Sequence, residues 1–190
     1  MGLGLHGLLQ IQPAAADRIR SDQTGSKVKG KYTMMNQEKL YKLMQDDLLN
    51  RDGPCTLYRM SDYWTMVTSK YYAVIMPHSD VDTICTGTQY TTDSSVHRRI
   101  DNTLNGSDMF YVGTMTVSIN MLKQKVIVFK DDFGLFYLIR YTAAADYLAR
   151  LKRKDRRIKR YQDLIVFWSP DDDFPIMACC EVSGNKVKGE

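Results

Sequence analysis

The sequence is poor in the residues that build metal sites and disulfide frameworks. It contains three histidines and four cysteines, and none of the cysteines forms a Cys-x-x-Cys pair. Structural zinc sites need closely spaced cysteine and histidine ligands, so this composition argues against a metal site. The cysteines are Cys55, Cys85, Cys179 and Cys180. We therefore expect buried free thiols in a reducing compartment.

Long apolar segments are also missing. No apolar run approaches the roughly 18 residues that a membrane-spanning helix requires. The N-terminus lacks the positively charged start of a secretory signal, and His6 stands where myristoylation requires Ser or Thr. These absences predict a cytoplasmic protein with no membrane partner.

Catalytic signatures are absent as well. The chain has no Walker motif, G-x-G-x-x-G, G-x-S-x-G or H-E-x-x-H. Asp171, Asp172 and Asp173 could hold Mg²⁺ for a nuclease, and His78 could serve as an acid or base. Each of these candidates also fits a polar turn, because the aspartates follow Ser-Pro and His78 follows Pro77. The turn interpretation is favoured, so we predict no catalytic residue and no cofactor.

Positive charge is the feature that the chain has in excess, and it is concentrated. The net charge is only +4, yet residues 150–160 carry eight cations and one anion. Periodicity predicts a helix from about residue 143 to 161, with an apolar stripe from Ala144 to Ile158. The remaining arc is cationic and consists of Arg150, Lys152, Arg153, Lys154, Arg156, Arg157 and Arg160.

This cationic arc predicts a polyanionic partner. Like charges four residues apart on a helix cost about 0.2–0.5 kcal/mol per pair, and several such pairs occur here. Nucleic acid would relieve that repulsion through phosphate contacts, and an acidic protein groove could do the same. The alternative is a solvated face, since cations near a helix C-terminus also interact favourably with the helix dipole.

The remaining pattern predicts an α+β fold with antiparallel β-meanders packed by three helices. The other two helices are expected at 36–50, capped by Asn36, and at about 93–105. Two-residue turns between short apolar runs indicate hairpins. Strands are expected at 55–60, 63–68, 71–76, 109–119, 125–129, 135–141, 163–168 and 174–182, with a weaker one at 81–86.

The chain is expected to form one domain over residues 35–182, followed by a tail at 183–190. Residues 1–34 are predicted to be a disordered or non-native extension, because strong patterning begins at Met34 and Met35. Lys29–Lys31 can be encoded by a purine-rich run like a ribosome-binding site, which predicts a start at Met34 or Met35. The alternative is a genuine flexible basic arm. Such operon-like ends resemble those of accessory proteins from phages and mobile elements, and this resemblance implies a bacterial host.

From these observations the sequence predicts a non-enzymatic binding protein that acts on nucleic acid or on a nucleoprotein complex. The resemblance to mobile-element proteins implies, as one form of this activity, inhibition of a CRISPR nuclease or another defence nuclease. Two alternatives stay open: a clamp-like replication accessory protein that binds nucleic acid, and an Mg²⁺-dependent nuclease. The oligomeric state is not predicted.

Overall fold

The computed structural model describes residues 35–50, 55–69, 71–84, 90–91, 94–119, 121–151, 157–169 and 174–182. All of these belong to the compact unit Tyr32–Glu190. The predicted extension 1–34 and the predicted tail 183–190 lie outside the described residues. Within the described part of the chain, no helix is long and apolar enough to cross a membrane.

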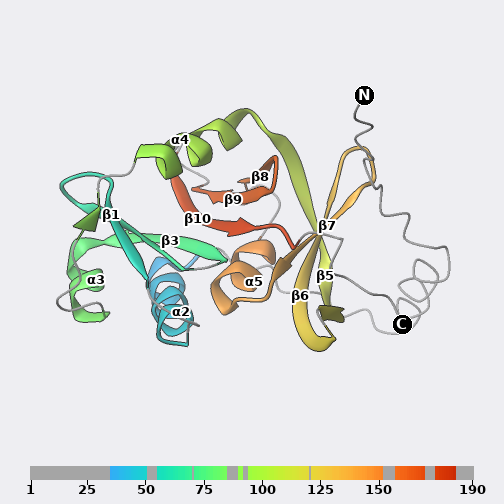
Figure 1. The fold of residues 1–190 in the computed structure, drawn as a ribbon, viewed down its shortest axis with the longest axis horizontal. Coiled ribbons are helices and arrows are strands. Elements are labelled where there is room, and N and C mark those ends of the chain that lie inside the picture. The colour runs from blue at the N-terminus through green and yellow to red at the C-terminus, as the bar shows by residue number, and fades with distance from the viewer. Residues whose placement is uncertain are drawn as a thin grey trace, which may run out of the picture. The chain divides into compact units, whose positions relative to one another are not determined.

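The fold is α+β and is built on a largely antiparallel sheet, as the sequence predicts (Figure 1). The strands are β1 Thr56–Arg59, β2 Trp64–Thr68, β3 Tyr72–Pro77, β4 Tyr90–Thr91, β5 Ser107–Ile119, β6 Leu122–Asp131, β7 Phe136–Arg140, β8 Arg157–Tyr161, β9 Leu164–Trp168 and β10 Pro175–Cys180. Their order in the sheet is β4-β1-β2-β3-β10-β9-β8-β5-β6-β7. Only β4 runs parallel to its neighbour, β1.

Three meanders lie side by side in this sheet. Strands β1–β3 form one, β5–β7 form another, and β8–β10 stand between them although they come last in the chain. Strand β10 pairs with β3, and β8 pairs with β5. The two earlier meanders are therefore joined through the final one.

The sheet also curls until its β7 edge meets the end of β10. Ile139 of β7 forms an antiparallel bridge with Glu181, and the amide of Val182 donates to the carbonyl of Leu138 at 2.8 Å. Strands β10, β9, β8, β5, β6 and β7 consequently surround a shared interior, in which Phe129 and Phe167 lie edge to face with ring centroids 6.0 Å apart.

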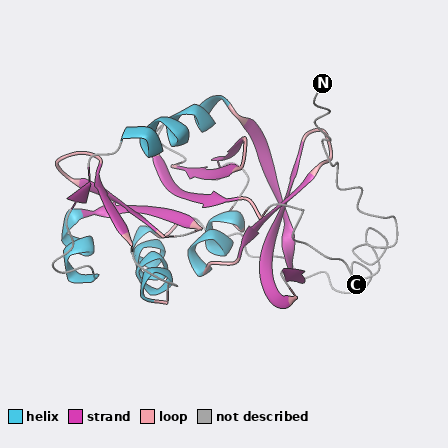
Figure 2. Ribbon diagram, in the orientation of Figure 1, coloured by secondary structure: helices cyan, strands magenta, loops and turns pink. Residues whose placement is uncertain are grey.

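Helices cover both faces of the sheet (Figure 2). They are α2 Gln37–Leu49, α3 His78–Ile84, α4 Ser94–Asn102 with the 3₁₀ turn η1 Thr103–Asn105, and α5 Ala143–Ala149. Helices α2, α3 and α5 pack on one core cluster, and α4 packs on the other through Ile100. All five residues of β9 are buried because this strand is covered on both sides.

Helices α2 and α5 are joined by the carboxylate of Asp47. Leu40, Met44 and Leu48 recur every four residues and bury one face of α2, while the Asn36 side chain caps its start as predicted. On the same helix, the two oxygens of Asp47 accept from the backbone N–H groups of Ala143 and Ala144 at 2.9 and 2.8 Å. Asp47 therefore caps α5 across the core.

The prediction of one basic helix over residues 143–161 is wrong, because only its first part is helical among the described residues. Helix α5 ends at Ala149, and Arg157–Tyr161 form strand β8, which pairs with β9. Gln162 adopts a φ of 56°, which lets the chain reverse between Tyr161 and Leu164. Leu151 and Ile158 are both buried, as the helical stripe required, but they reach the core from different elements. Residues 152–156 lie outside the described residues.

The weaker strand expected at 81–86 is also wrong. Residues His78–Ile84 form helix α3, so the described part of the chain contains four α-helices rather than three. Strand β3 ends where the His78 amide donates to the Tyr63 carbonyl. Among the described side chains of this helix, Val81 enters the first core cluster. The β-branched residues near it gave a misleading strand signal.

Candidate nucleic-acid interface

The cations predicted on one helical arc are divided between different elements. Arg150 is the C-cap residue of α5, Arg157 begins β8, and Arg160 lies near the end of that strand. The predicted contacts Lys152, Arg153, Lys154 and Arg156 lie outside the described residues. The described cations of this group therefore do not share a helix face.

Arg160 has a clear role inside the fold. Its Nε and Nη2 groups both donate to Oε2 of Glu181, at 3.2 and 3.0 Å, and its guanidinium lies 4.1 Å from the ring centroid of Tyr137. The Tyr137 hydroxyl in turn donates to Oδ2 of Asp131 at 3.0 Å. Burial raises the pKa of the Glu181 carboxyl, and Arg160 opposes that rise. The Arg160 side chain thus ties β8 to the closure between β7 and β10.

Arg150 stands at the surface, where an external group can reach it. Its side chain is 56% exposed, pairs with Oδ2 of Asp146 at 2.9 Å, and places its guanidinium 5.6 Å from the ring centroid of Tyr111. The other carboxylate oxygen of Asp146 is buried without a hydrogen-bond partner. The Tyr111 ring belongs to β5, so Arg150 connects the end of α5 to the long β5–β6 hairpin.

That hairpin extends beyond the end of β7 as a two-stranded ribbon. Strand β7 stops at Arg140, which pairs with Val126, whereas β5 and β6 continue pairing as far as Ile119 and Leu122. We call Thr116–Ile119 with Leu122–Lys125 the distal ribbon. Met121, with a φ of 68°, lies in the turn that connects its strands.

One face of the distal ribbon is polar and cationic. Its cross-strand pairs are Thr116 with Lys125 and Ser118 with Lys123, and side chains two residues apart on a strand share a face. Thr116, Lys123 and Lys125 are exposed. The sequence contains no carboxylate between Asp108 and Asp131, so the ribbon carries no internal counter-charge.

The polar face of the ribbon continues toward α5. The Lys125 ammonium lies 3.6 Å from the ring centroid of Tyr141, whose amide donates to the Lys125 carbonyl. Burial raises the pKa of the Tyr111 hydroxyl, which keeps that group protonated and neutral. We call the combined surface the cationic face. It comprises Tyr111, Thr114, Thr116, Ser118, Lys123, Lys125, Tyr141 and Arg150.

The candidate acid or base His78 is held by two hydrogen bonds. Its Nε2 lies 3.0 Å from the carbonyl of Ser61, and its Nδ1 contacts the hydroxyl of Thr65. A carbonyl can only accept, so Nε2 carries the proton and, in the neutral ring, Nδ1 accepts from Thr65. Thr65 is fully buried, His78 is half-buried, and these two bonds engage both of its ring nitrogens. The geometry gives His78 a structural role at the start of α3.

The remaining candidates for chemistry yield no site among the described residues. Asp171, Asp172 and Asp173 lie outside them, and nowhere within them do three or more His, Cys, Asp or Glu side chains come together to hold a metal ion. Cys55, Cys179 and Cys180 are free thiols, as predicted for them, but of these three Cys179 is buried while Cys55 and Cys180 are only half-buried. Burial raises the pKa of the Cys179 and Cys180 thiols, which disfavours a reactive thiolate.

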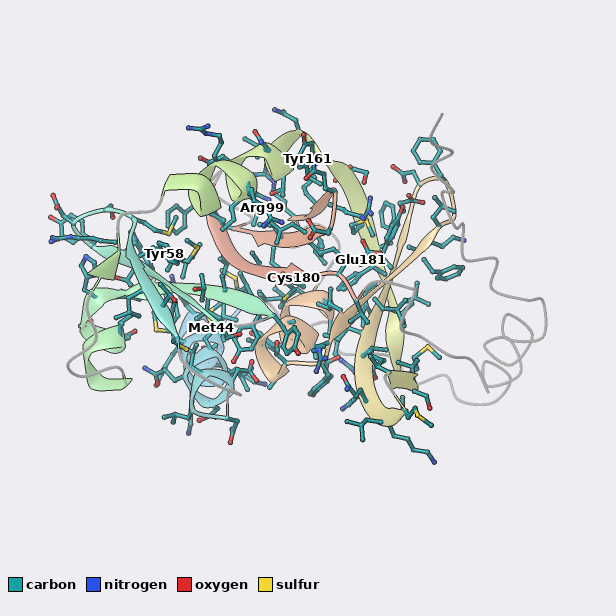
Figure 3. All side chains as sticks on the ribbon, in the orientation of Figure 1. Met44, Tyr58, Arg99, Tyr161, Cys180 and Glu181 are labelled. Atoms are coloured by element: carbon teal, nitrogen blue, oxygen red, sulfur yellow. The ribbon has the colours of Figure 1, made fainter. Side chains whose placement is uncertain are left out.

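A small cavity lies beneath α4. Its lining includes Ile100, Leu164, Ala178, Arg99 and Cys180. Figure 3 labels Arg99 and Cys180. Its volume is about 100 Å³, well below the roughly 300–1,000 Å³ of typical ligand pockets. Nη2 of Arg99 is paired with Oδ1 of Asp163 at 2.8 Å. The cavity is therefore too small for an ordinary organic cofactor.

Sequence reasoning missed the residues that the structure brings together on the cationic face. Lys123, Lys125, Tyr111 and Tyr141 were not singled out, because each is unremarkable alone. A usable signal was nevertheless present: Thr and Ser alternate along residues 114–118, and lysines alternate at 123 and 125, within a stretch without carboxylates. Comparison with known proteins adds no assignment, because no family model, no curated protein and no solved structure matches this chain.

Proposed function

We propose that this protein binds nucleic acid without acting on it as an enzyme, and that the cationic face contacts the phosphates. The observation that carries the proposal is the exposure of Lys123 and Lys125 on a ribbon that has no carboxylate. Two ammonium groups on one strand face repel each other, and nearby phosphates would remove that cost. The neighbouring hydroxyls of Thr116 and Ser118 can donate to phosphate oxygens as well.

Two features of the face suit phosphate contacts in particular. The tyrosine rings hold Lys125 and Arg150 in place, which reduces the side-chain entropy that these cations lose on binding. The excess of positive charge in residues 150–160 begins at Arg150 itself, so the sequence continues the same charge from that point. Contacts from Lys152, Arg153, Lys154 and Arg156 to the same partner stay a prediction.

Binding to DNA can be tested directly with two charge-reversal variants of strand β6. Anisotropy of a labelled 30-base-pair duplex, measured over a salt series, should give a steep fall of affinity with salt. The double variant Lys123→Glu/Lys125→Glu should bind at least about tenfold more weakly and lower the salt slope by about two. Lys130→Glu is the matched control, because Lys130 is exposed on the same strand but faces the other side.

Three results separate this proposal from its alternatives. Equal binding by the wild type and the double variant would show that the cationic face is only a solvated surface. Binding to a defence nuclease complex but to no free nucleic acid would favour the inhibitor in its protein-directed form. Cleavage of the probe that requires Mg²⁺ and is lost in Asp172→Ala would replace the proposal with a nuclease.

A further inference from the structure

We infer that the distal ribbon enters the major groove of duplex DNA with its polar face toward the base edges. This inference rests on the proposed function and specifies the form of nucleic acid. Among the described residues, the ribbon has two strands and no third strand beside it, because β7 ends at the pair formed by Val126 and Arg140. Strands lie about 4.8 Å apart, so such a ribbon fits a B-form major groove about 12 Å wide.

The side chains on the polar face have the chemistry that major-groove reading uses. Each of its two cross-strand pairs, Thr116 with Lys125 and Ser118 with Lys123, presents one hydroxyl and one ammonium. Lysine donates to the N7 and O6 acceptors of guanine, and a hydroxyl can donate or accept at any base pair. The ribbon carries no carboxylate that would repel the flanking phosphates.

The opposite face fixes the ribbon to the body of the protein. Ile119 and Val126 are almost completely buried in a third apolar cluster that also includes Val117. A ribbon anchored in this way presents its polar side chains in a fixed register, as reading of base edges requires. Arg150 lies at the end of the cationic face near α5, where it can contact the backbone beside the groove.

Duplex DNA is favoured over the other forms of nucleic acid. Single strands are usually bound by stacking bases on open aromatic rings, whereas the rings of Tyr111 and Tyr141 each already hold a cation. Duplex RNA has a deep, narrow major groove that side chains cannot read. A two-stranded ribbon with short polar side chains therefore fits B-form DNA best.

Four probes of one sequence test this inference: duplex DNA, duplex RNA, single-stranded DNA, and duplex DNA in which 7-deazaguanine replaces guanine. The expected result is binding to duplex DNA about tenfold tighter than to duplex RNA or to the single strand. Removal of the guanine N7 acceptors should weaken binding by about tenfold. In Lys123→Ala this sensitivity to 7-deazaguanine should be reduced, while Lys130→Ala should keep it.

The neutral variant Thr116→Ala/Ser118→Ala adds a readout that charge does not affect. It should lose part of the preference for duplex DNA over duplex RNA, with an unchanged salt slope and an unchanged urea unfolding midpoint. Equal affinity for duplex DNA and duplex RNA, or no effect of 7-deazaguanine, would overturn the inference and leave the proposed function standing. Absence of binding to all four probes would overturn the proposed function itself.

Discussion

Substitution of Arg160 tests whether this cation stabilises the fold, because its side chain contacts Glu181 and Tyr137 within the protein. The perturbation is a double-mutant cycle with Arg160→Met and Glu181→Gln, which keeps the volume of both side chains. Their side chains are 25% and 20% exposed, so the pair is neither a surface ion pair nor a fully buried one.

The magnitude follows from that intermediate burial. Exposed ion pairs contribute about 0.2–1 kcal/mol, whereas loss of one partner from a buried pair costs about 3–5 kcal/mol. The Arg160→Met change removes two charge-assisted hydrogen bonds and the contact with the Tyr137 ring. We expect it to lower the free energy of unfolding by about 2 kcal/mol, with a coupling energy to Glu181 of about 1 kcal/mol.

Urea unfolding followed by tryptophan fluorescence measures both quantities. A loss of about 2 kcal/mol should lower the urea midpoint by about 1 M. Arg98→Met, at an exposed arginine of α4, is the control and should leave the midpoint unchanged. A coupling energy near zero would refute the structural role of Arg160. A large loss of nucleic-acid affinity in a variant with an unchanged midpoint would refute it as well.

The same pair gives a pH dependence whose sign can be worked out. Burial raises the pKa of Glu181 above its ordinary value of 4.5, so the folded state holds this proton more readily than the unfolded state does. The stability from this group is present below the ordinary pKa and declines as the pH rises through the folded pKa. Glu181→Gln should remove this decline of stability with pH. Arg160→Met should make the decline larger and extend it to higher pH, since Arg160 lowers the Glu181 pKa.

Three further predictions concern other parts of the fold. Asp47→Ala should lower the free energy of unfolding by about 2 kcal/mol, because it removes the carboxylate that accepts from the first two amides of α5. The exposed neighbour Asp46 gives the control Asp46→Ala, and an equal effect of the two variants would refute this role of Asp47. Gly106→Ala should lower the thermal midpoint markedly, since an added Cβ would lie 2.1 Å from the carbonyl oxygen of Arg160, and an unchanged midpoint would contradict this contact. Cys179 should resist iodoacetamide in the native protein and react after unfolding, as mass spectrometry can establish; native labelling would contradict its burial.

The hairpins could be predicted from sequence because their signals are local. The turn containing Ser61 and Asp62 separates two short apolar runs, and the Ser61 hydroxyl accepts from the amides of Tyr63 and Trp64. The residue types of the turn and of the strands agreed, so the strands of β1–β3, β5 and β7 were predicted within two residues of their observed bounds. The strand predicted at 125–129 was too short, because β6 runs from Leu122 to Asp131. A prediction from one sequence is dependable where the turn residues and the strand residues indicate the same structure, as they do here.

Strand β8 could not be predicted because its local signals point in the wrong direction. Leu151 and Ile158 are seven residues apart, which fits two turns of a helix, and the arginines and lysines around them are good helix formers. Burial of Ile158 in the first core cluster overrides that propensity. Strand β8 pairs with β9 and completes a sheet that also contains strands distant in sequence. The cationic face was missed for a related reason, because pairing of Ser118 with Lys123 becomes visible only once the register is known.

The position of the last meander has a consequence for how the molecule is made. A ribosome releases β1–β3 and β5–β7 before β8–β10 exist, so the edges of β3 and β5 lack these native neighbours until the later strands have been made. Unpaired edges of this kind attract other strands. A chain interrupted before residue 157 would hold two separate sheets with open edges, and we expect such products to aggregate or to require a chaperone. Synthesis of β8–β10 therefore joins two sheets that were formed earlier into one.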